Sequence, residues 1–215
     1  MRFMGYLRRL IKQRTNRPRD DLITALVQAK EQDDRLTEDE ILAMVFLLLS
    51  AGHETTVNLI AIASGVLALL EHPDQWEKLR NDPSLIALAI EELVRFTSPA
   101  ETATERYPRE DVTTAGATIP KGELVLAVSA SANRDAARFD NPGVVDITRQ
   151  NNKRLAFGQG IHYCVGAPLS RLEGQVAINT LIERIPNPRF RVSSDQLRWR
   201  RSCIVRGLAA LPVSF

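Results

Sequence analysis

The sequence predicts a mainly α-helical protein with a small β part. Three observations lead to this prediction. Apolar residues at helical spacing dominate residues 3–96, β-branched and small residues alternate within 112–135, and a second helical pattern covers 167–185. With 215 residues, 44% of them hydrophobic, the chain is long enough to bury one sizeable core. We therefore expect a single domain over residues 1–215.

The N-terminal third predicts a series of helices. Spacing of apolar residues indicates a first helix over 3–14 and a second over 21–32, with the turn NRPRDD between them. Thr37 and Glu40 form the capping box TEDE, which predicts that a long core helix begins there. We expect this helix to run to about Leu70, just before His72-Pro73 stops it.

Shorter elements follow in the rest of the chain. Ala115-Gly116 and Pro120-Lys121-Gly122 are turn signals, and they predict a β-hairpin around them. The expected elements after the long helix are two short helices over 73–81 and 83–96, a hairpin-rich segment over 112–135, a last helix over 167–185 and a strand-like tail over 206–215.

Composition and charge exclude several classes of protein. A net charge of +2 is too small to indicate nucleic-acid binding by itself, and the N-terminus lacks the apolar core of a signal peptide. The most apolar run, residues 41–70, is interrupted by His53 and Glu54, so we expect no membrane span. Two cysteines, Cys164 and Cys203, make no disulfide framework and favour a reducing, cytoplasmic setting.

Cys164 stands in a glycine-rich turn, FGQGIHYCVG, directly before a predicted helix. A thiolate ligand needs its charge stabilised, and the amides of residues 165–167 at the helix start would do this. Phe157 would keep water from the sulfur. Three glycines permit positive φ and the close approach of a large flat ligand: Gly158, Gly160 and Gly166.

The alternative for Cys164 is a small buried hydrophobe, which is also our interpretation of Cys203. No CxxC or His/Cys cluster with zinc spacing is present, so the pattern favours a single-thiolate site.

This turn resembles the haem-binding loop of the cytochrome P-450 haem-thiolate monooxygenases, in which Phe-x-x-Gly-x-x-x-Cys-x-Gly carries the axial cysteine. Phe157, Gly160, Cys164 and Gly166 fill those positions, and the following APLSRLE is similar to the soluble bacterial members. The resemblance implies that Cys164 binds the iron of haem b. It also implies a monooxygenase that inserts one atom of dioxygen into a small apolar substrate, with electrons from a ferredoxin-type partner.

A second motif, AGHETT, interrupts the long apolar helix with Gly52, Glu54 and Thr55. A carboxylate beside a hydroxyl in an apolar helix is costly unless it is used, although a simple helix kink with a solvated Glu is an alternative. In the family that the chain resembles, this segment lies over the distal haem face. The resemblance therefore implies a haem between this helix and the helix after Cys164, with Gly52 giving it room. Thr55 and Glu54 would relay protons for oxygen activation.

A third motif places Glu92 and Arg95 at i, i+3 spacing on one helix face. Such pairs are usually exposed and weak, but the flanking LIALAIEELVRF favours a buried pair. The resemblance implies that this Glu-x-x-Arg pair is completed by a downstream residue, for which Arg134 is our prediction. It also implies that His162 and Arg106 contact haem propionates, although Arg106 could equally be a solvated loop residue.

The resemblance covers only the C-terminal half of the family pattern. Arg154 and Arg171 flank the cysteine turn and are our candidates to meet an acidic ferredoxin. The alternative is a non-catalytic or partner-dependent fragment with weak or no haem binding. Its exposed apolar surface would need a missing N-terminal half or a second copy. Oxygenation driven by peroxide, without need of Glu54 and Thr55, is a further option.

Overall fold

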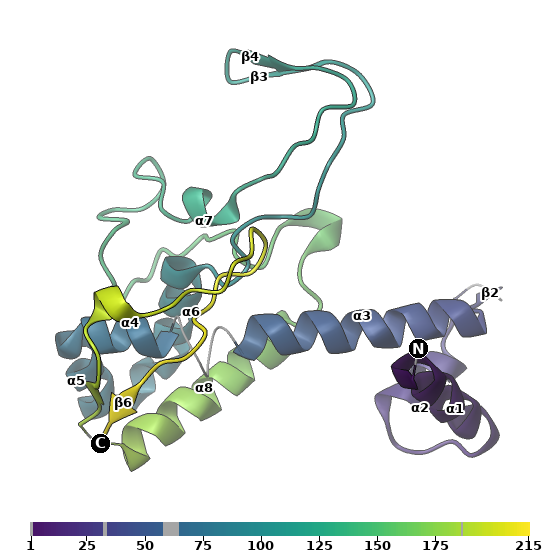
Figure 1. The fold of residues 1–215 in the computed structure, drawn as a ribbon, viewed down its shortest axis with the longest axis horizontal. Coiled ribbons are helices and arrows are strands. Elements are labelled where there is room, and N and C mark those ends of the chain that lie inside the picture. The colour runs from purple at the N-terminus through teal and green to yellow at the C-terminus, as the bar shows by residue number, and fades with distance from the viewer. Residues whose placement is uncertain (1, 32–33, 58–64, 186) are drawn as a thin grey trace. The chain divides into compact units, whose positions relative to one another are not determined.

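The computed structural model describes residues 2–31, 34–57, 65–185 and 187–215 (Figure 1). Contacts divide the chain into two compact units, Met1–His53 and Glu54–Phe215, and each is described by itself. The described residues form mostly helices, with three sheets of two strands each, so the predicted fold class is confirmed. Among these helices, none combines the length and the apolar character that a membrane span requires.

In the first unit, an amphipathic helix packs on the start of a longer one. Helix α1 (Arg2–Asn16) and the N-terminal part of α3 (Glu38–Val57) bury their apolar faces against each other. Helix α2 (Leu22–Gln28) covers the edge of this cluster. The residues fully buried in the cluster are Leu7, Ile11, Ile41, Leu42 and Val45.

Helix α2 is shorter than predicted. The Asp21 carboxylate caps its N-terminus by accepting from the Thr24 amide at 2.9 Å. The helix ends at Gln28, because Ala29 is already extended with ψ 131°. Strand β1 (Lys30–Glu31) then pairs antiparallel with β2 (Asp34–Arg35) where the sequence predicted more helix.

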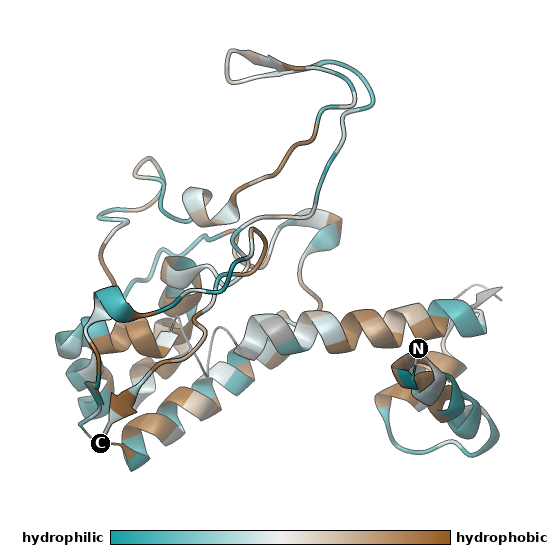
Figure 2. Ribbon diagram, viewed as in Figure 1, coloured by the Kyte–Doolittle hydropathy of each residue, from teal (hydrophilic) through white to brown (hydrophobic). Residues whose placement is uncertain are grey.

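Helix α3 begins at the predicted capping box. The Glu40 carboxylate accepts from the Thr37 amide at 2.8 Å, and Thr37 Oγ1 accepts from the Glu40 amide at 3.3 Å. Figure 2 shows the hydrophobic stretch of α3 giving way to paler residues toward its C-terminal end. Of the predicted continuation to Leu70, residues 58–64 lie outside the described chain, and α4 (Gly65–Glu71) forms the last part.

The core of the second unit lies between four helices. These are α4, α5 (Pro73–Asn81), α6 (Ile86–Thr97) and α8 (Ala167–Arg184), with a 3₁₀ turn over Pro83–Leu85 leading into α6. Helix α6 packs against both α4 and α8. At the α6–α8 crossing, a Cβ added to Gly174 would lie 3.2 Å from Ile90 Cδ1, so glycine allows the close approach.

The β structure of the second unit lies in the segments that connect and follow these helices. Strands β3 (Val112–Thr114) and β4 (Ala117–Ile119) form the predicted hairpin at the tip of a long arm (Figure 1). Ala115 and Gly116 both have positive φ, which is the backbone of a two-residue hairpin turn. The remaining short elements are α7 (Ser129–Ala132), 3₁₀ turns over Gly160–His162 and Ser194–Gln196, and the antiparallel pair β5 (Arg189–Phe190) with β6 (Val213–Ser214).

Candidate functional site

The cysteine loop, residues 154–166, presents Cys164 at the surface of the second unit. The Cys164 amide donates to the Phe157 carbonyl at 2.9 Å and so closes the loop. Gly158 and Gly160 both adopt φ +72°, a region that side chains other than glycine rarely enter. The glycine spacing therefore sets the turn that presents the thiol.

Helix α8 begins three residues after Cys164, with Gly166 as its N-cap residue. Gly166 has φ −83°, so it does not use the positive φ that a glycine permits. A Cβ there would lie 3.8 Å from Cys164 Sγ, and its absence leaves space beside the sulfur. The Ala167 amide donates to the Cys164 carbonyl at 3.2 Å, so this amide is bonded to the loop backbone and not to the sulfur. The helix N-terminus still places its positive end behind the thiol.

The cysteine loop and helix α8 carry exposed apolar side chains. Ile161 is 96% and Val165 is 81% accessible to solvent. Leu169, Leu172 and Val176 on α8 are also exposed, at a spacing that puts them on one helix face. Ile161 and Val165 thus leave the loop apolar and exposed near its single thiol, and α8 carries a separate exposed apolar face.

Cys203 is also exposed, which corrects the interpretation that it belongs to the core. It lies in the irregular segment after the 3₁₀ turn Ser194–Gln196, and its carbonyl accepts from Thr102 Oγ1 at 2.7 Å. A buried position was inferred from its residue type alone, and the irregular backbone of this segment leaves it at the surface.

A charged cluster holds the Phe157 ring. The guanidinium carbons of Arg154 and Arg171 lie 5.3 and 4.8 Å from the ring centre, and the Tyr163 ring lies edge-on at 6.4 Å. Both arginines form ion pairs with Glu91 of α6. The Arg154 side chain is only 8% exposed, so it is not the surface contact for a ferredoxin that the sequence predicted.

The Glu92–Arg95 pair is fully buried, as the apolar flanks predict. Two parallel hydrogen bonds of 2.7 and 2.8 Å join the guanidinium to the carboxylate. The same guanidinium donates to the carbonyls of Asn133, Pro142 and Val144 at 2.8, 2.9 and 3.1 Å. Helix α6 is thereby fixed to the loop that leads toward the cysteine.

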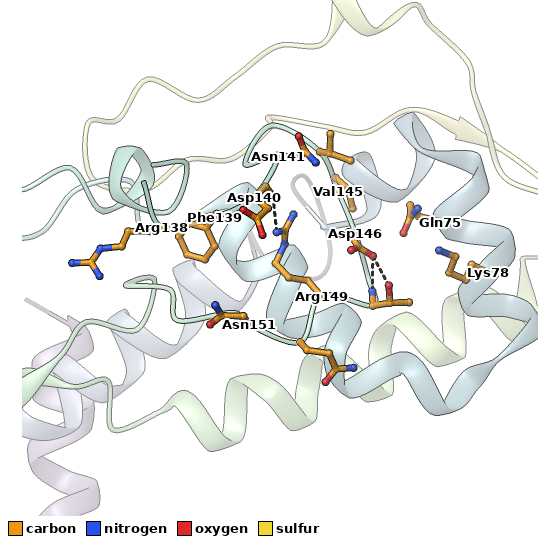
Figure 3. A pocket seen from close by; sticks show the side chains of 13 residues that line it. Gln75, Lys78, Arg138, Phe139, Asp140, Asn141, Val145, Asp146, Arg149 and Asn151 are labelled. Carbon is orange, nitrogen blue, oxygen red and sulfur yellow. Dashed lines mark hydrogen bonds between the residues drawn. The ribbon is translucent and has the colours of Figure 1, made fainter. Parts of the chain in front are cut away.

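The third member of this network is Arg149, which corrects the prediction of Arg134. Arg149 Nε donates to Glu92 Oε2 at 3.1 Å, and its Nη1 donates to the Asp140 carbonyl at 2.8 Å (Figure 3). Arg134 instead donates to the Phe96 carbonyl at 2.7 Å and lies 3.8 Å from the Phe96 ring centre. Sequence reasoning missed Arg149 because it stands 57 positions after Glu92 in an irregular loop without periodicity.

The network also borders a pocket of about 610 Å³ between α5 and residues 138–151 (Figure 3). Its lining is largely polar, with Lys78 and Arg138 beside Asp140 and Asp146. This polar pocket lies apart from the cysteine loop, and its lining does not suit a small apolar molecule.

Asn133 links the network to the cysteine loop. Its side chain is fully buried, donates to Ser98 Oγ at 2.9 Å and accepts from the Leu155 amide at 2.7 Å. Ser98 ends α6 in the left-handed conformation with φ 42°. The end of α6 and the start of the cysteine loop are therefore joined through one amide side chain.

The other predicted site residues occupy separate elements. Gly52, Glu54 and Thr55 lie in the last two turns of α3, where Thr55 is half-buried and the side chain of Glu54 lies outside the described part. His162 is exposed in the cysteine loop. Arg106 is exposed on the hairpin arm, where its backbone pairs with Val125.

The chemistry of the loop fits an iron porphyrin held by one thiolate. Within the described ranges, no three His, Cys, Asp or Glu side chains gather closely enough to hold a metal ion between them. A single thiolate can hold a metal ion if most of the other ligands of that ion come from a cofactor, as the four porphyrin nitrogens do for a haem iron. The space beside the sulfur at Gly166 leaves room for such a ligand, and the exposed apolar residues of the loop suit its apolar faces.

Comparison with known proteins gives the same class. The cytochrome P450 family model matches residues 2–196. Cytochrome P450 107B1 of Saccharopolyspora erythraea is 53% identical over 97% of the chain, and vitamin D(3) 25-hydroxylase of Pseudonocardia autotrophica is 49% identical over 98%. The solved structure of the bacillaene polyketide synthase cytochrome P450 PksS of Bacillus subtilis superimposes with a TM-score of 0.95 at 45% identity over 99% of the chain.

The chain belongs to the cytochrome P450 family, whose members bind haem b. It covers 51%, 52% and 54% of the lengths of those three proteins respectively. The chain therefore spans about half the length of the relatives it matches, as the resemblance predicted.

Proposed function

We propose that this chain supplies the iron-binding half of a haem-thiolate monooxygenase, with Cys164 as the axial ligand. The supporting observation is the cysteine loop itself. An exposed thiol is held by the Cys164–Phe157 backbone hydrogen bond between two positive-φ glycines and the start of α8. A haem held by a thiolate activates dioxygen, because the thiolate pushes electron density toward the bond that must break.

In this proposal, the residues of the chain have separate roles in binding haem and in moving protons. Cys164 binds the iron, and Gly166 leaves room beside the sulfur. Ile161 and Val165, both exposed in the same loop, would supply apolar contacts to the porphyrin. Thr55 and Glu54 would move protons to the reacting oxygen, while His162 and Arg106 would balance the propionate charge.

The reaction proposed is insertion of one oxygen atom into a carbon–hydrogen bond of a small apolar substrate. The other atom leaves as water, which requires two protons and two electrons from a donor. A ferredoxin-type protein is the proposed donor, by the family resemblance. We further propose a cytoplasmic location, because two unpaired cysteines suit a reducing compartment.

The test compares Cys164→Ser with Cys203→Ser after haem is added to the purified chain. Both cysteines are exposed, so the second variant is a matched control for the loss of a surface thiol. We expect Cys164→Ser to lose the thiolate-type absorption band of the reduced, carbon monoxide-bound form, and Cys203→Ser to keep it. An unchanged band in Cys164→Ser would exclude Cys164 as the ligand.

A second candidate is a partner-dependent or non-catalytic fragment, and one observation favours it. Leu169, Leu172 and Val176 form an exposed apolar face on α8, and the chain spans half the length of its relatives. A segment equivalent to the other half of those relatives, or a second copy, would cover such a surface. Adding the N-terminal half of a close relative should then increase haem affinity; unchanged affinity would argue against this candidate.

A further inference from the structure

The geometry points to Glu91 as a positioning residue that orders the cysteine loop by holding Arg154 and Arg171 against the Phe157 ring. This inference rests on the proposed function only in that it treats Cys164 as the haem ligand. Glu91 differs from its neighbour Glu92, which faces Arg95 and Arg149 in the buried network. Glu91 points to the other side of α6, toward the loop.

The first step is the bridge made by the Glu91 carboxylate. Its Oε1 accepts from Arg171 Nε at 2.7 Å, and its Oε2 forms an ion pair with Arg154 Nη2. Arg154 opens the cysteine loop and Arg171 lies on the second turn of α8 beyond it. One carboxylate on α6 therefore ties together the two ends of the segment that carries Cys164.

The second step carries this bridge to the ring of Phe157. Both guanidinium groups lie over that ring, at 5.3 and 4.8 Å from its centre. Arg171 Nη2 also donates to the Tyr163 hydroxyl at 3.2 Å, and the Tyr163 ring packs edge-on against Phe157. The aromatic pair is thus held from the α6 side by two cations that share one anion.

The third step connects Phe157 to the thiol. The Phe157 carbonyl accepts from the Cys164 amide at 2.9 Å, so the position of Phe157 fixes the backbone of Cys164. A continuous set of contacts therefore runs from Glu91 through the arginines and the Phe157 ring to the cysteine. Since Tyr163 and Cys164 are adjacent in the chain, the contact through Tyr163 restrains the same residue from its other side.

Because Arg154 and Arg171 are partly buried, solvent cannot readily take the place of the Glu91 carboxylate between them. The side chains of Arg154, Glu91 and Arg171 are 8%, 23% and 30% exposed. Burial, with a smaller effect of the nearby Arg171, lowers the pKa of Arg154 to about 10. Two cations in this setting repel each other once the anion between them is removed, and the less exposed Arg154 cannot turn readily to solvent.

The test uses Glu91→Gln in the full chain and measures hydrogen–deuterium exchange at the Cys164 and Tyr163 amides. The substitution keeps the shape of the side chain and removes its charge. We expect exchange at these amides to become at least about tenfold faster, with α5 unchanged, because opening of the loop is local. Glu77→Gln on α5 removes the carboxylate of an exposed pair with Arg80 (2.8 Å) and is the matched control, expected to leave the loop unchanged.

Two results would overturn the assignment. One is unchanged exchange at Cys164 in Glu91→Gln. The other is an equal increase in the loop and in α5, which would show that Glu91 acts only on global stability. Should Glu91→Gln not fold, Arg171→Gln breaks one arm at a more exposed site and should raise exchange by a smaller factor at the same amides.

A spectroscopic readout separates this inference from the proposed function. In haem-loaded protein, Glu91→Gln should lower the fraction of the reduced, carbon monoxide-bound form that shows the thiolate-type band. If the unaltered chain shows no such band while Glu91→Gln still speeds exchange at Cys164, the proposed function fails and the positioning role stands. If the unaltered chain shows the band, and Glu91→Gln changes neither the exchange at Cys164 nor the fraction with that band, the positioning role fails and the proposed function stands.

Discussion

The Glu92–Arg95 network and the cysteine loop lie in the same unit but are built in opposite ways. Glu92 and Arg95 are fully buried, and their charged groups are joined by hydrogen bonds to each other, to Arg149 and to the backbone around Asn133. Cys164 lies at the surface between exposed apolar residues. The difference separates two tasks: the network fixes the backbone, whereas the loop leaves space and an accessible ligand for something that binds there.

The largest expected effect comes from breaking the network. Glu92→Ala leaves the Arg95 guanidinium charged and buried, which costs about 3–5 kcal/mol of unfolding free energy. Urea unfolding followed by circular dichroism measures this cost. Glu77→Ala, in an exposed pair, should cost less than about 1 kcal/mol. Equal costs for the two variants would show that burial of the Glu92 pair does not matter for stability.

The identity of the third partner predicts a smaller difference. Arg149→Gln removes a charged donor to Glu92, and we expect a loss of about 1–3 kcal/mol in the free energy of unfolding. Arg134→Gln loses a contact with the Phe96 ring and one hydrogen bond at a more exposed position, and should cost less. Urea unfolding measures the loss of free energy for both variants. A larger loss for Arg134→Gln than for Arg149→Gln would favour Arg134 as the third partner.

In the cysteine loop, the backbone conformation of two glycines predicts a further, smaller difference in stability. Gly160→Ala forces a side chain into φ +72° and should cost about 1 kcal/mol, although no atom lies near its added Cβ. Gly166→Ala, at φ −83°, avoids this strain and should cost less in the chain without haem. Thermal unfolding of both variants tests this, and a greater loss for Gly166→Ala would contradict it.

The smallest effect on stability is expected at Thr55, where the predicted consequence is chemical. Thr55→Ala should leave haem binding unchanged while less of the electron flow ends in product, because a proton donor is removed. Haem titration measures binding of the cofactor, and the ratio of product formed to electrons consumed in haem-loaded protein measures the coupling. Loss of haem binding would instead assign Thr55 a structural role.

Sequence reasoning worked where local chemistry decides the structure. The capping box at Thr37, the helix over 73–81 and the hairpin at Ala115-Gly116 all follow from short-range rules, and the structure has each of them. The glycine spacing before Cys164 likewise predicts the positive φ values of Gly158 and Gly160. Such features depend on residues close in the chain, so one sequence is enough to find them.

It failed where partners come from distant segments. Arg149 meets Glu92 across an irregular loop, and Glu91 meets Arg154 and Arg171 from about 60 to 80 positions away. No periodicity or motif marks such pairs, because the fold alone brings them together. The end of α2 was missed for a related reason, since the β1–β2 pairing overrides the helical pattern after Gln28.

The most direct measurement is the absorption spectrum of the reduced, carbon monoxide-bound form of the unaltered 215-residue chain after addition of haem. A thiolate-type Soret band at one haem per chain is the expected result, because the cysteine loop and its supports from α6 and α8 all lie within this chain. Haem uptake without that band, or no uptake at all, would contradict the claim that this half of the fold builds the thiolate site by itself.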